Sequence, residues 1–318
     1  MAGRITIERV PAGQQARAVR FLAGGRRRDA SARGRAGTLT MLLERRERPW
    51  RLWWARRRRR CVAAAVLLEQ AGGVGVLQAA GAEAPGVDVA ALTETIRRLS
   101  IDACARGLRF VQALADGDAA ANERVWAAAG YTFLAELAYL RKDVSRPWAA
   151  EGTGGDALAW RAYGSFDEAE LARVLEATYV GSQDVPLLAG LRTTGEIIAG
   201  HKASGEFCPE AWLLAERAGR PVGCVLVNDI PVAASADVAY MGVVPAARGR
   251  GLGRALLRRA AHDARGRGRT VLTVATDAQN SYATRVYDAE GFETVARRRA
   301  HVFLPRHAGG ASGAAQGL

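Results

Sequence analysis

The sequence has almost no lysine, few cysteines and no leader-like start. Of its 45 basic residues only Lys142 and Lys202 are lysines, so nearly all its positive charge is arginine. The 4 cysteines are scattered, without the spacing that binds metals or the density typical of secreted disulfide-rich domains. Residues 1–9 lack the apolar core of a signal peptide. We therefore expect a reduced, cytoplasmic protein without a metal ion.

A membrane span is also excluded by closer reading. The weakly polar segment 61–82 follows five arginines, Arg56 to Arg60, as a membrane anchor does. However, Glu69 and Gln70 lie in its middle, and the Ala-Gly-Gly that follows has the composition of a turn. Two short buried strands joined in a hairpin fit this segment better, and no membrane association is expected.

The positive charge is concentrated at the N-terminus. The net charge is +13, yet residues 1–60 hold 18 arginines and only 4 acidic residues, while the remaining chain is close to neutral. Basic runs beside tryptophans, as here, can bind single-stranded nucleic acid or an acidic partner. A solvated hairpin, with Leu52–Arg56 on a strand and Arg57–Arg60 at its turn, is the simpler interpretation and the one we favour.

The chain repeats itself at an offset of 161 residues. Residues 124–131 (RVWAAAGY) lie over 285–292 (RVYDAEGF) without a gap, and Asp116 falls on Asp277. With 318 residues and 49% hydrophobic residues, the chain has room for two domains. We predict an α/β fold of two tandem copies, each a mixed, mostly antiparallel sheet flanked by helices. The predicted boundaries are 1–145 and 157–305, with a linker at 146–156 and a disordered tail at 306–318.

In the second copy, apolar spacing predicts strands and helices in alternation. Strands are expected at 157–163, 211–216, 222–228, 237–244, 270–275 and 292–304, and helices at 166–178, 194–200, 253–265 and 281–290.

The sharpest motif is an apolar strand that ends at Pro245 and continues into a glycine-rich turn and a helix. Its turn, RGRGLGR over 248–254, lets backbone N–H groups converge, and the helix N-terminus and three arginines add positive charge. A pyrophosphate would fit this cradle. The spacing matches neither the Rossmann fingerprint nor the P-loop. A glycine-rich turn without a ligand stays the alternative.

The same residues resemble a known family. Arg-x-x-Gly-x-Gly after a strand that ends Val-Val-Pro resembles the acyl-CoA motif of the GNAT N-acetyltransferase superfamily. The segment 277–292 resembles that family's second motif, N-x(6)-Y-x(3)-G-F. The resemblance covers about 157–305, and it reaches the first half only through the internal repeat. The tandem arrangement is similar to that of the mycothiol synthases.

The resemblance implies site residues. Backbone groups of Val243 and Val244 would bond the acyl carbonyl and the pantetheine, where the strand splays from its neighbour at a bulge. Asn280 would reach the pantetheine arm, and Tyr287 would protonate the departing CoA thiolate. As Trp126 replaces Tyr287 in the first copy, a plain core aromatic is the alternative for that position. The N–H groups expected to hold the pyrophosphate are those of Arg248, Gly249, Arg250, Gly251, Leu252, Gly253, Arg254 and Ala255.

The general base is left open. Asp237 occupies a place where some family members carry a base carboxylate, and strict alternation would put it on one face with Ala239, Met241 and Val243. It could equally be a strand-end residue facing water. His201 is a second candidate, or a structural histidine. Asp184 lies in the expected acceptor loop, where it would pair with a cationic amine or start a turn. Bound water could also relay the proton.

The first copy has lost the cradle. At the 161 offset, Arg248 becomes Val87, Gly251 becomes Ala90 and Gly253 becomes Leu92. We expect this copy to keep the fold without CoA chemistry, and to shape the acceptor site or stabilise the pair.

The sequence thus predicts an acetyl-CoA-dependent N-acetyltransferase whose second copy acetylates a small-molecule or peptide amine by direct attack in a ternary complex. A non-catalytic CoA-binding scaffold, and a nucleic-acid or acidic-partner binder acting through the arginine-rich half, are the alternatives. The acceptor's identity, the acyl length and the choice between monomer and dimer stay open.

Overall fold

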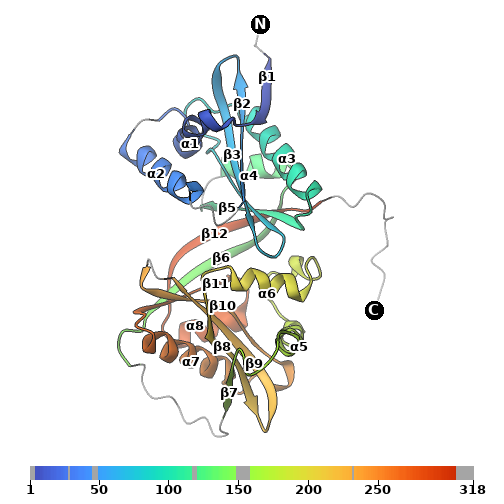
Figure 1. The fold of residues 1–318 in the computed structure, drawn as a ribbon, viewed down its shortest axis with the longest axis vertical. Coiled ribbons are helices and arrows are strands. Elements are labelled where there is room, and N and C mark those ends of the chain that lie inside the picture. The colour runs from blue at the N-terminus through green and yellow to red at the C-terminus, as the bar shows by residue number, and fades with distance from the viewer. Residues whose placement is uncertain are drawn as a thin grey trace, which may run out of the picture.

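The structure, a computed structural model, describes residues 4–27, 29–44, 49–116, 120–147, 158–230 and 233–305. One continuous sheet of 12 strands runs through both halves in the order β1-β2-β3-β4-β5-β12-β6-β11-β10-β9-β8-β7 (Figure 1). The first half contains β1 (Ile5–Arg9), η1 (Ala12–Gln14), α1 (Gln15–Gly24), α2 (Ala30–Glu44), β2 (Trp50–Arg57), β3 (Arg60–Gln70), β4 (Val74–Ala79), α3 (Val89–Ala105), β5 (Phe110–Asp116), α4 (Ala120–Ala128) and β6 (Thr132–Asp143). The second half contains β7 (Ala159–Ala162), α5 (Glu168–Tyr179), η2 (Pro186–Leu188), α6 (Thr194–Lys202), β8 (Glu206–Arg217), β9 (Arg220–Ile230), β10 (Ser235–Val243), η4 (Pro245–Ala247), α7 (Leu252–Gly266), β11 (Val271–Asp277), α8 (Ser281–Ala289) and β12 (Glu293–Phe303).

The two halves repeat each other at the offset found in the sequence. Strand β5 and helix α4 begin and end 161 residues before β11 and α8. The strands and helices predicted for the second half are all present, within a few residues of the expected ends. The segment 61–82 forms most of the hairpin β3–β4, as expected. Within the described residues, none of the helices is long and apolar enough to cross a bilayer.

The halves exchange their last strands. Strand β12 lies between β5 and β6, and β6 lies between β12 and β11. The pairing of Glu293 with Arg141 and that of Thr132 with Val302 are equivalents of each other at the 161 offset, so a pseudo-two-fold axis passes between the strands. An ion pair joins the equivalent residues Glu136 and Arg297 at 2.7 Å. Each half therefore completes its sheet with a strand of the other.

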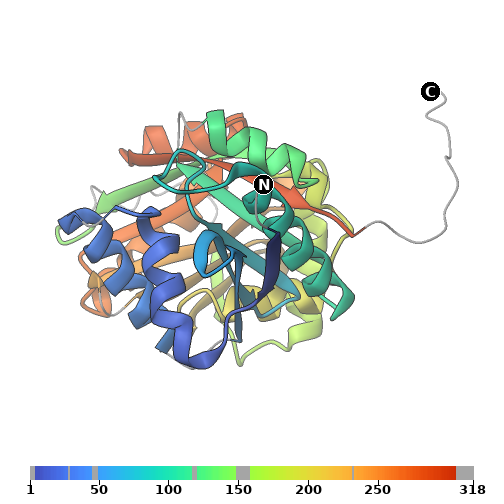
Figure 2. The same cartoon turned by 90° about the horizontal axis from the view of Figure 1, so that it is seen from above.

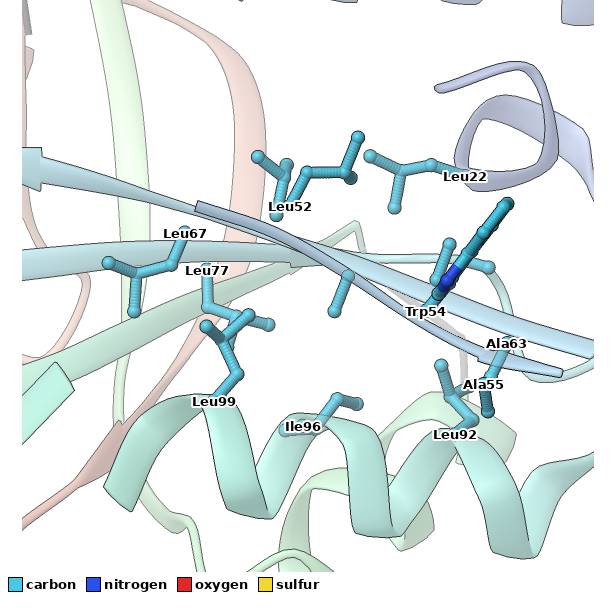
Figure 3. Close-up of a cluster of buried hydrophobic side chains, with 14 of the residues drawn as sticks. Leu22, Leu52, Trp54, Ala55, Ala63, Leu67, Leu77, Leu92, Ile96 and Leu99 are labelled. Atoms are coloured by element: carbon cyan, nitrogen blue, oxygen red, sulfur yellow. The ribbon is translucent and has the colours of Figure 1, made fainter. Parts of the chain in front are cut away.

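Helices cover both faces of the sheet. In the first half α1 and α2 lie on one side and α3 on the other (Figures 1 and 2). Leu22 of α1 points at the sheet from one side, and Leu92, Ile96 and Leu99 of α3 point at it from the other (Figure 3). Each such buried side chain contributes about 1.5–3 kcal/mol. In the second half, separate clusters lie under α7 with α8 and under α5 with α6.

Two predicted segments fall largely or wholly outside the described residues. These are the linker at 146–156, of which only the first two residues are described, and the tail at 306–318. The boundaries at 145 and 157 stay a prediction, and in the sheet β6 and β12 each lie beside strands of both halves.

Candidate active site

Strands β10 and β11 diverge in the middle of the second half. They pair in parallel from Ser235 with Val271 to Val238 with Val274 and no further, although β10 continues to Val243. The register of β10 against β9 shifts between Val238 and Tyr240, which marks a bulge. A bulge bends the strand that carries it, so the end of β10 turns away from β11. The splayed pair expected from the family resemblance is present.

The turn after β10 leaves its backbone donors free. Gly249 and Gly251 have φ of 74° and 77°, a region that favours glycine, and an added Cβ at either would meet no atom within 4 Å. No described acceptor binds the N–H of Gly249, Arg250 or Gly251. Helix α7 begins at Leu252 without a side-chain cap, and the N–H groups of a first helical turn have no partner inside the helix. The cradle predicted from the sequence is therefore open to an anion.

The first and last of the N–H groups predicted to hold the pyrophosphate, over 248–255, donate hydrogen bonds within the protein. The Arg248 N–H donates to the Pro245 carbonyl oxygen at 3.2 Å, and the Ala255 N–H donates to that of Gly251. The free donors thus lie between these two residues, over 249–254.

The three arginines of the turn have different tasks. The Arg248 guanidinium donates to the carbonyl oxygens of Val243 (3.0 Å) and Thr178 (2.9 Å), which ties the turn to β10 and α5. Arg254 pairs with Glu290, whose side chain is only 1% exposed, and so joins α7 to α8. Arg250 is exposed, and its side chain forms no hydrogen bond or ion pair with a described residue. Of these three arginines, Arg250 is the one whose charge is available to a phosphate.

Val243 and Val244 face opposite ways. The Val244 N–H donates to the Val222 oxygen of β9 at 3.0 Å. Because main-chain groups alternate along an antiparallel strand, Val243 directs its N–H to the other side, into the gap that the missing β11 partner leaves. Of the two predicted residues, Val243 is placed to donate there.

Tyr287 of α8 is buried in the hydrophobic cluster against which Val243 packs. Its side chain is buried, packs on Phe292 with ring centroids 5.6 Å apart, and makes no hydrogen bond with a described residue. Burial, and then the nearby carboxylates of Asp184 and Asp237, raise the pKa of Tyr287 well above its usual range. The hydroxyl therefore keeps its proton at neutral pH and is free to donate it.

Asn280 caps α8. Its side-chain oxygen accepts from the Ala283 N–H at 3.1 Å, so this oxygen is already engaged. Its amide lies beside the carboxyl group of Asp184.

The face predicted for Asp237 is wrong in one respect. Ala236 and Val238 pack into the cluster under α7 and α8, so Asp237 points to the opposite face, where Thr273 donates to it at 2.6 Å. Beyond the bulge, Met241 and Val243 pack against the α7 side instead. The extra residue of the bulge reverses the alternation that a regular strand would keep. Burial raises the pKa of Asp237, and the Thr273 hydrogen bond opposes that rise.

Asp184 reaches the gap from the loop after α5. The residue as a whole is exposed, but its carboxyl group accepts from the Asp277 N–H at 3.3 Å at the end of β11. Loss of water around this carboxyl group, and the nearby Asp277 carboxylate, raise its pKa. Gln183 accepts from the Ser281 N–H at the start of α8, so the loop is anchored on both elements. Asp184 lies near enough to Tyr287 to raise the pKa of that hydroxyl, and its role toward an amine acceptor stays a prediction.

His201 belongs to a second group of side chains beside the gap. Its ring lies 5.6 Å from that of Tyr240, which in turn lies 5.5 Å from Tyr179. Burial, and then Arg192, lower the pKa of His201 to about 4, so the ring is neutral at pH 7. The Tyr240 hydroxyl shares a 2.7 Å hydrogen bond with Thr178.

The sequence analysis missed Tyr179, Tyr240 and Arg192. Arg192 is half-buried, makes no ion pair with a described residue, and lies over the Phe110 ring of the first half at 5.6 Å. Burial lowers its pKa. Only the density of polar side chains in the loop region hinted at these residues, because their proximity depends on the packing of α5, α6 and β10.

The first half closes the site from one side. Its β3–β4 turn lies so close to α6 that a Cβ on Gly72 would come within 2.2 Å of the Glu196 carbonyl oxygen. Arg109 forms an ion pair with Glu196 at 2.8 Å.

The equivalent helix start in the first half is filled by the chain itself. Helix α3 is capped by Asp88, whose carboxylate accepts from the Ala91 N–H at 3.0 Å and pairs with Arg57. A phosphate would have to displace this carboxylate.

Comparison with known proteins agrees with this geometry. Residues 187–292 match the Acetyltransferase (GNAT) family. Over 216 residues the chain is 32% identical to a mycothiol acetyltransferase from Nocardia farcinica, an alignment that covers 66% of this chain and 68% of that protein. The chain belongs to the GNAT acetyltransferase family. It is accordingly an N-acetyltransferase enzyme, and GNAT enzymes take the acetyl group from acetyl-CoA.

Solved GNAT structures share the fold over nearly the whole chain. A GCN5-related N-acetyltransferase from Sphaerobacter thermophilus superposes with a TM-score of 0.62 at 18% identity, covering 95% of this chain and 96% of that one. A tandem GNAT protein from the clavulanic acid biosynthesis pathway superposes with a TM-score of 0.53 at 16% identity, covering 97% and 100%. The tandem GNAT arrangement is confirmed.

The free donors of 249–254 and the gap behind them fit the pyrophosphate and the pantetheine arm of acetyl-CoA. No metal cluster of three or more His, Cys, Asp or Glu side chains is found in the described part of the chain. The expectation that no metal is needed stays a prediction.

Proposed function

We propose that the second half of this GNAT enzyme transfers the acetyl group of acetyl-CoA to an amine by direct attack in a ternary complex. The observation that carries the proposal is the uncapped start of α7, whose free N–H groups follow the end of β10 where that strand no longer pairs with β11. Acetyl-CoA supplies the thioester. The reaction forms an amide bond and breaks the C–S bond, so the amine must lose a proton and the sulfur must gain one.

Tyr287 is the acid of this proposal. Its raised pKa keeps the hydroxyl protonated, and no described residue competes for that proton. A positioned general acid contributes roughly 10²–10⁴-fold to a rate.

Asp237 is the proposed base, with Asp184 holding the incoming ammonium group. Both carboxylates raise the pKa of Tyr287 electrostatically, Asp237 from the opposite face of the sheet. Both have raised pKa values, which makes each a better proton acceptor than an exposed carboxylate. His201, neutral because its pKa is about 4, lines the approach.

Direct attack is supported by the cysteines. Burial raises the pKa of Cys224, the cysteine on the β9 strand beside β10, to about 12. Cys61 and Cys104 in the first half have pKa values raised to about 11, and that of Cys208 is raised as well. A thiol becomes a nucleophile as its thiolate, so none of the four is activated to carry an acetyl group.

The acceptor that fits is a small molecule. The first half packs on α6 and places Phe110 against Arg192, which narrows the approach to β10. Arg192 offers a positive charge to an anionic or hydroxyl-rich part of the acceptor. The similarity to a mycothiol acetyltransferase supports an amine on a small thiol-bearing conjugate.

The test is calorimetric titration of acetyl-CoA into the wild type, Gly251→Asp and Gly266→Asp, followed by thiol-release assays with a panel of amines. Gly251→Asp places a carboxylate where the phosphate should lie. Gly266→Asp adds the same group at the other, exposed end of α7. We expect binding and turnover to fall at least 100-fold in the first variant only. Equal binding by both variants would overturn the proposal.

A further inference from the structure

A second pocket lies in the first half, away from the candidate active site. It has a volume of about 700 Å³ and lies between α1, α2 and the start of β3. Small-molecule sites span roughly 300–1,000 Å³. Its lining comes only from the segments 17–36 and 60–61, and includes Arg17, Arg20, Phe21, Gly25, Arg26, Arg27, Ala32, Arg33, Ala36, Arg60 and Cys61.

The lining carries six arginines and, among the described residues, no carboxylate. Five of the six, Arg17, Arg20, Arg26, Arg27 and Arg60, form no ion pair with a described acidic residue. Glu8 and Asp88 pair with Arg56 and Arg57, which lie outside the pocket, and Asp29 accepts from the Ala32 N–H at 2.8 Å. Like charges that line one pocket repel each other, and a bound polyanion would relieve the repulsion.

Two of the arginines are held in position. The Arg17 guanidinium donates to the Arg59 carbonyl oxygen at 2.7 Å. The Arg26 N–H donates to the Pro85 oxygen at 2.7 Å, and its side chain crosses Gly86 so closely that a Cβ there would come within 2.3 Å of the Arg26 Nε. Charged groups fixed before binding lose less entropy when a ligand arrives.

The floor of the pocket has the opposite character. Phe21, Ala32, Ala36 and Cys61 are all buried hydrophobic residues, whereas the six arginines are exposed at the rim. This combination suits a ligand with a flat apolar part and several phosphates. Inorganic phosphate would leave the floor unused, and a nucleic-acid strand needs a basic track longer than one pocket.

We propose that this pocket binds a nucleoside polyphosphate, with the base over the apolar floor and the phosphates on the arginine rim. This site would bind phosphates with arginine side chains, whereas the acetyl-CoA cradle would bind them with the N–H groups of a helix start. It lies in the first half, where Asp88 occupies the equivalent helix start. It is therefore independent of the acetyl-CoA site, and it uses six of the arginines of the basic N-terminal segment, of which only Arg60 belongs to the hairpin turn 57–60.

The experiment is titration of ATP into the full chain at low salt, in the wild type, Arg20→Glu/Arg27→Glu, Arg173→Glu/Arg220→Glu and Gly251→Asp. The second double variant is a matched control, because Arg173 on α5 and Arg220 beside the β8–β9 turn are exposed arginines outside the pocket. We expect one equivalent of ATP to bind to the wild type, the control and Gly251→Asp alike, and at least tenfold more weakly to the pocket variant. Acetyl-CoA binding should survive in the pocket variant.

Inorganic triphosphate, adenosine and a single-stranded RNA are titrated alongside. ATP binding at least tenfold tighter than either triphosphate or adenosine supports the two-part site. Loss of ATP binding in Gly251→Asp would mean that ATP enters the acetyl-CoA site, and would overturn the proposal. Absence of ATP binding, equal binding by both double variants, or RNA binding without ATP binding would overturn it too.

Discussion

The two halves of this GNAT enzyme share one fold and differ at one helix start. The N-cap of α7 is Gly251, which leaves free N–H groups at the helix start, whereas the N-cap of α3 is Asp88, whose carboxylate binds the first turn of that helix and Arg57. The strand before the cradle also differs, since a register shift is seen in β10 against β9 and none in β4 against β3. We propose that a few backbone positions decide which half of this repeated fold binds acetyl-CoA, while both halves keep the packed core.

The largest effect on kcat is expected at Tyr287, in contrast to its repeat equivalent Trp126. Tyr287→Phe removes the proposed acid and should lower kcat at least 100-fold, with the KM for acetyl-CoA nearly unchanged. Trp126 is buried and its indole N–H has no described partner, so Trp126→Phe should leave kcat within twofold. Steady-state kinetics on both variants decide the matter, and equal loss in both would show that the aromatic position is structural.

The second contrast is between His201 and Thr40, its equivalent at the 161 offset, whose side chain does not titrate. Burial lowers the His201 pKa from 6.5 to about 4, so the unfolded chain binds the proton more readily between these values. The group therefore destabilises the fold as pH falls from 6.5 towards 4, by about 3 kcal/mol at about 1.36 kcal/mol per pKa unit. His201→Gln should remove that part of the slope in urea unfolding measured across pH. An unchanged slope would mean that the ring is solvated.

The smallest expected effect concerns the filled helix start. Asp88→Ala should cost about 1 kcal/mol of stability, because α3 loses its cap. Asp167→Ala, which removes the same kind of cap from α5, is the matched control and should cost a similar amount. Denaturant midpoints give both values. Asp88→Ala should gain no acetyl-CoA site, since the glycines of the turn are missing there; a second equivalent of bound acetyl-CoA would contradict this.

Much of this could be predicted from the sequence, because its signals are local. Apolar spacing gave the elements from β7 to β12, and the turn RGRGLGR identified the cradle. Three features depend on tertiary structure instead. The bulge after Val238 reverses the face of Met241 and Val243, the exchange of β6 and β12 follows from sheet assembly, and Arg192 meets Phe110 only when the halves pack.

The guanidinium of Arg248 shows the same limit within the motif itself. Its place in the pattern suggests a phosphate ligand, but two carbonyl oxygens take its donors. Arg248 reaches the Thr178 carbonyl oxygen because α5 packs beside the end of β10, and no local sequence pattern encodes that packing.

The most direct test of the difference between the halves is the stoichiometry of acetyl-CoA binding to the full chain, measured by calorimetry with independently determined protein concentration. One equivalent per chain, lost in Gly251→Asp and kept in Asp88→Ala, is the predicted result. Two equivalents per chain, with one surviving in Gly251→Asp, would show that the first half binds acetyl-CoA despite Asp88 and would contradict the account.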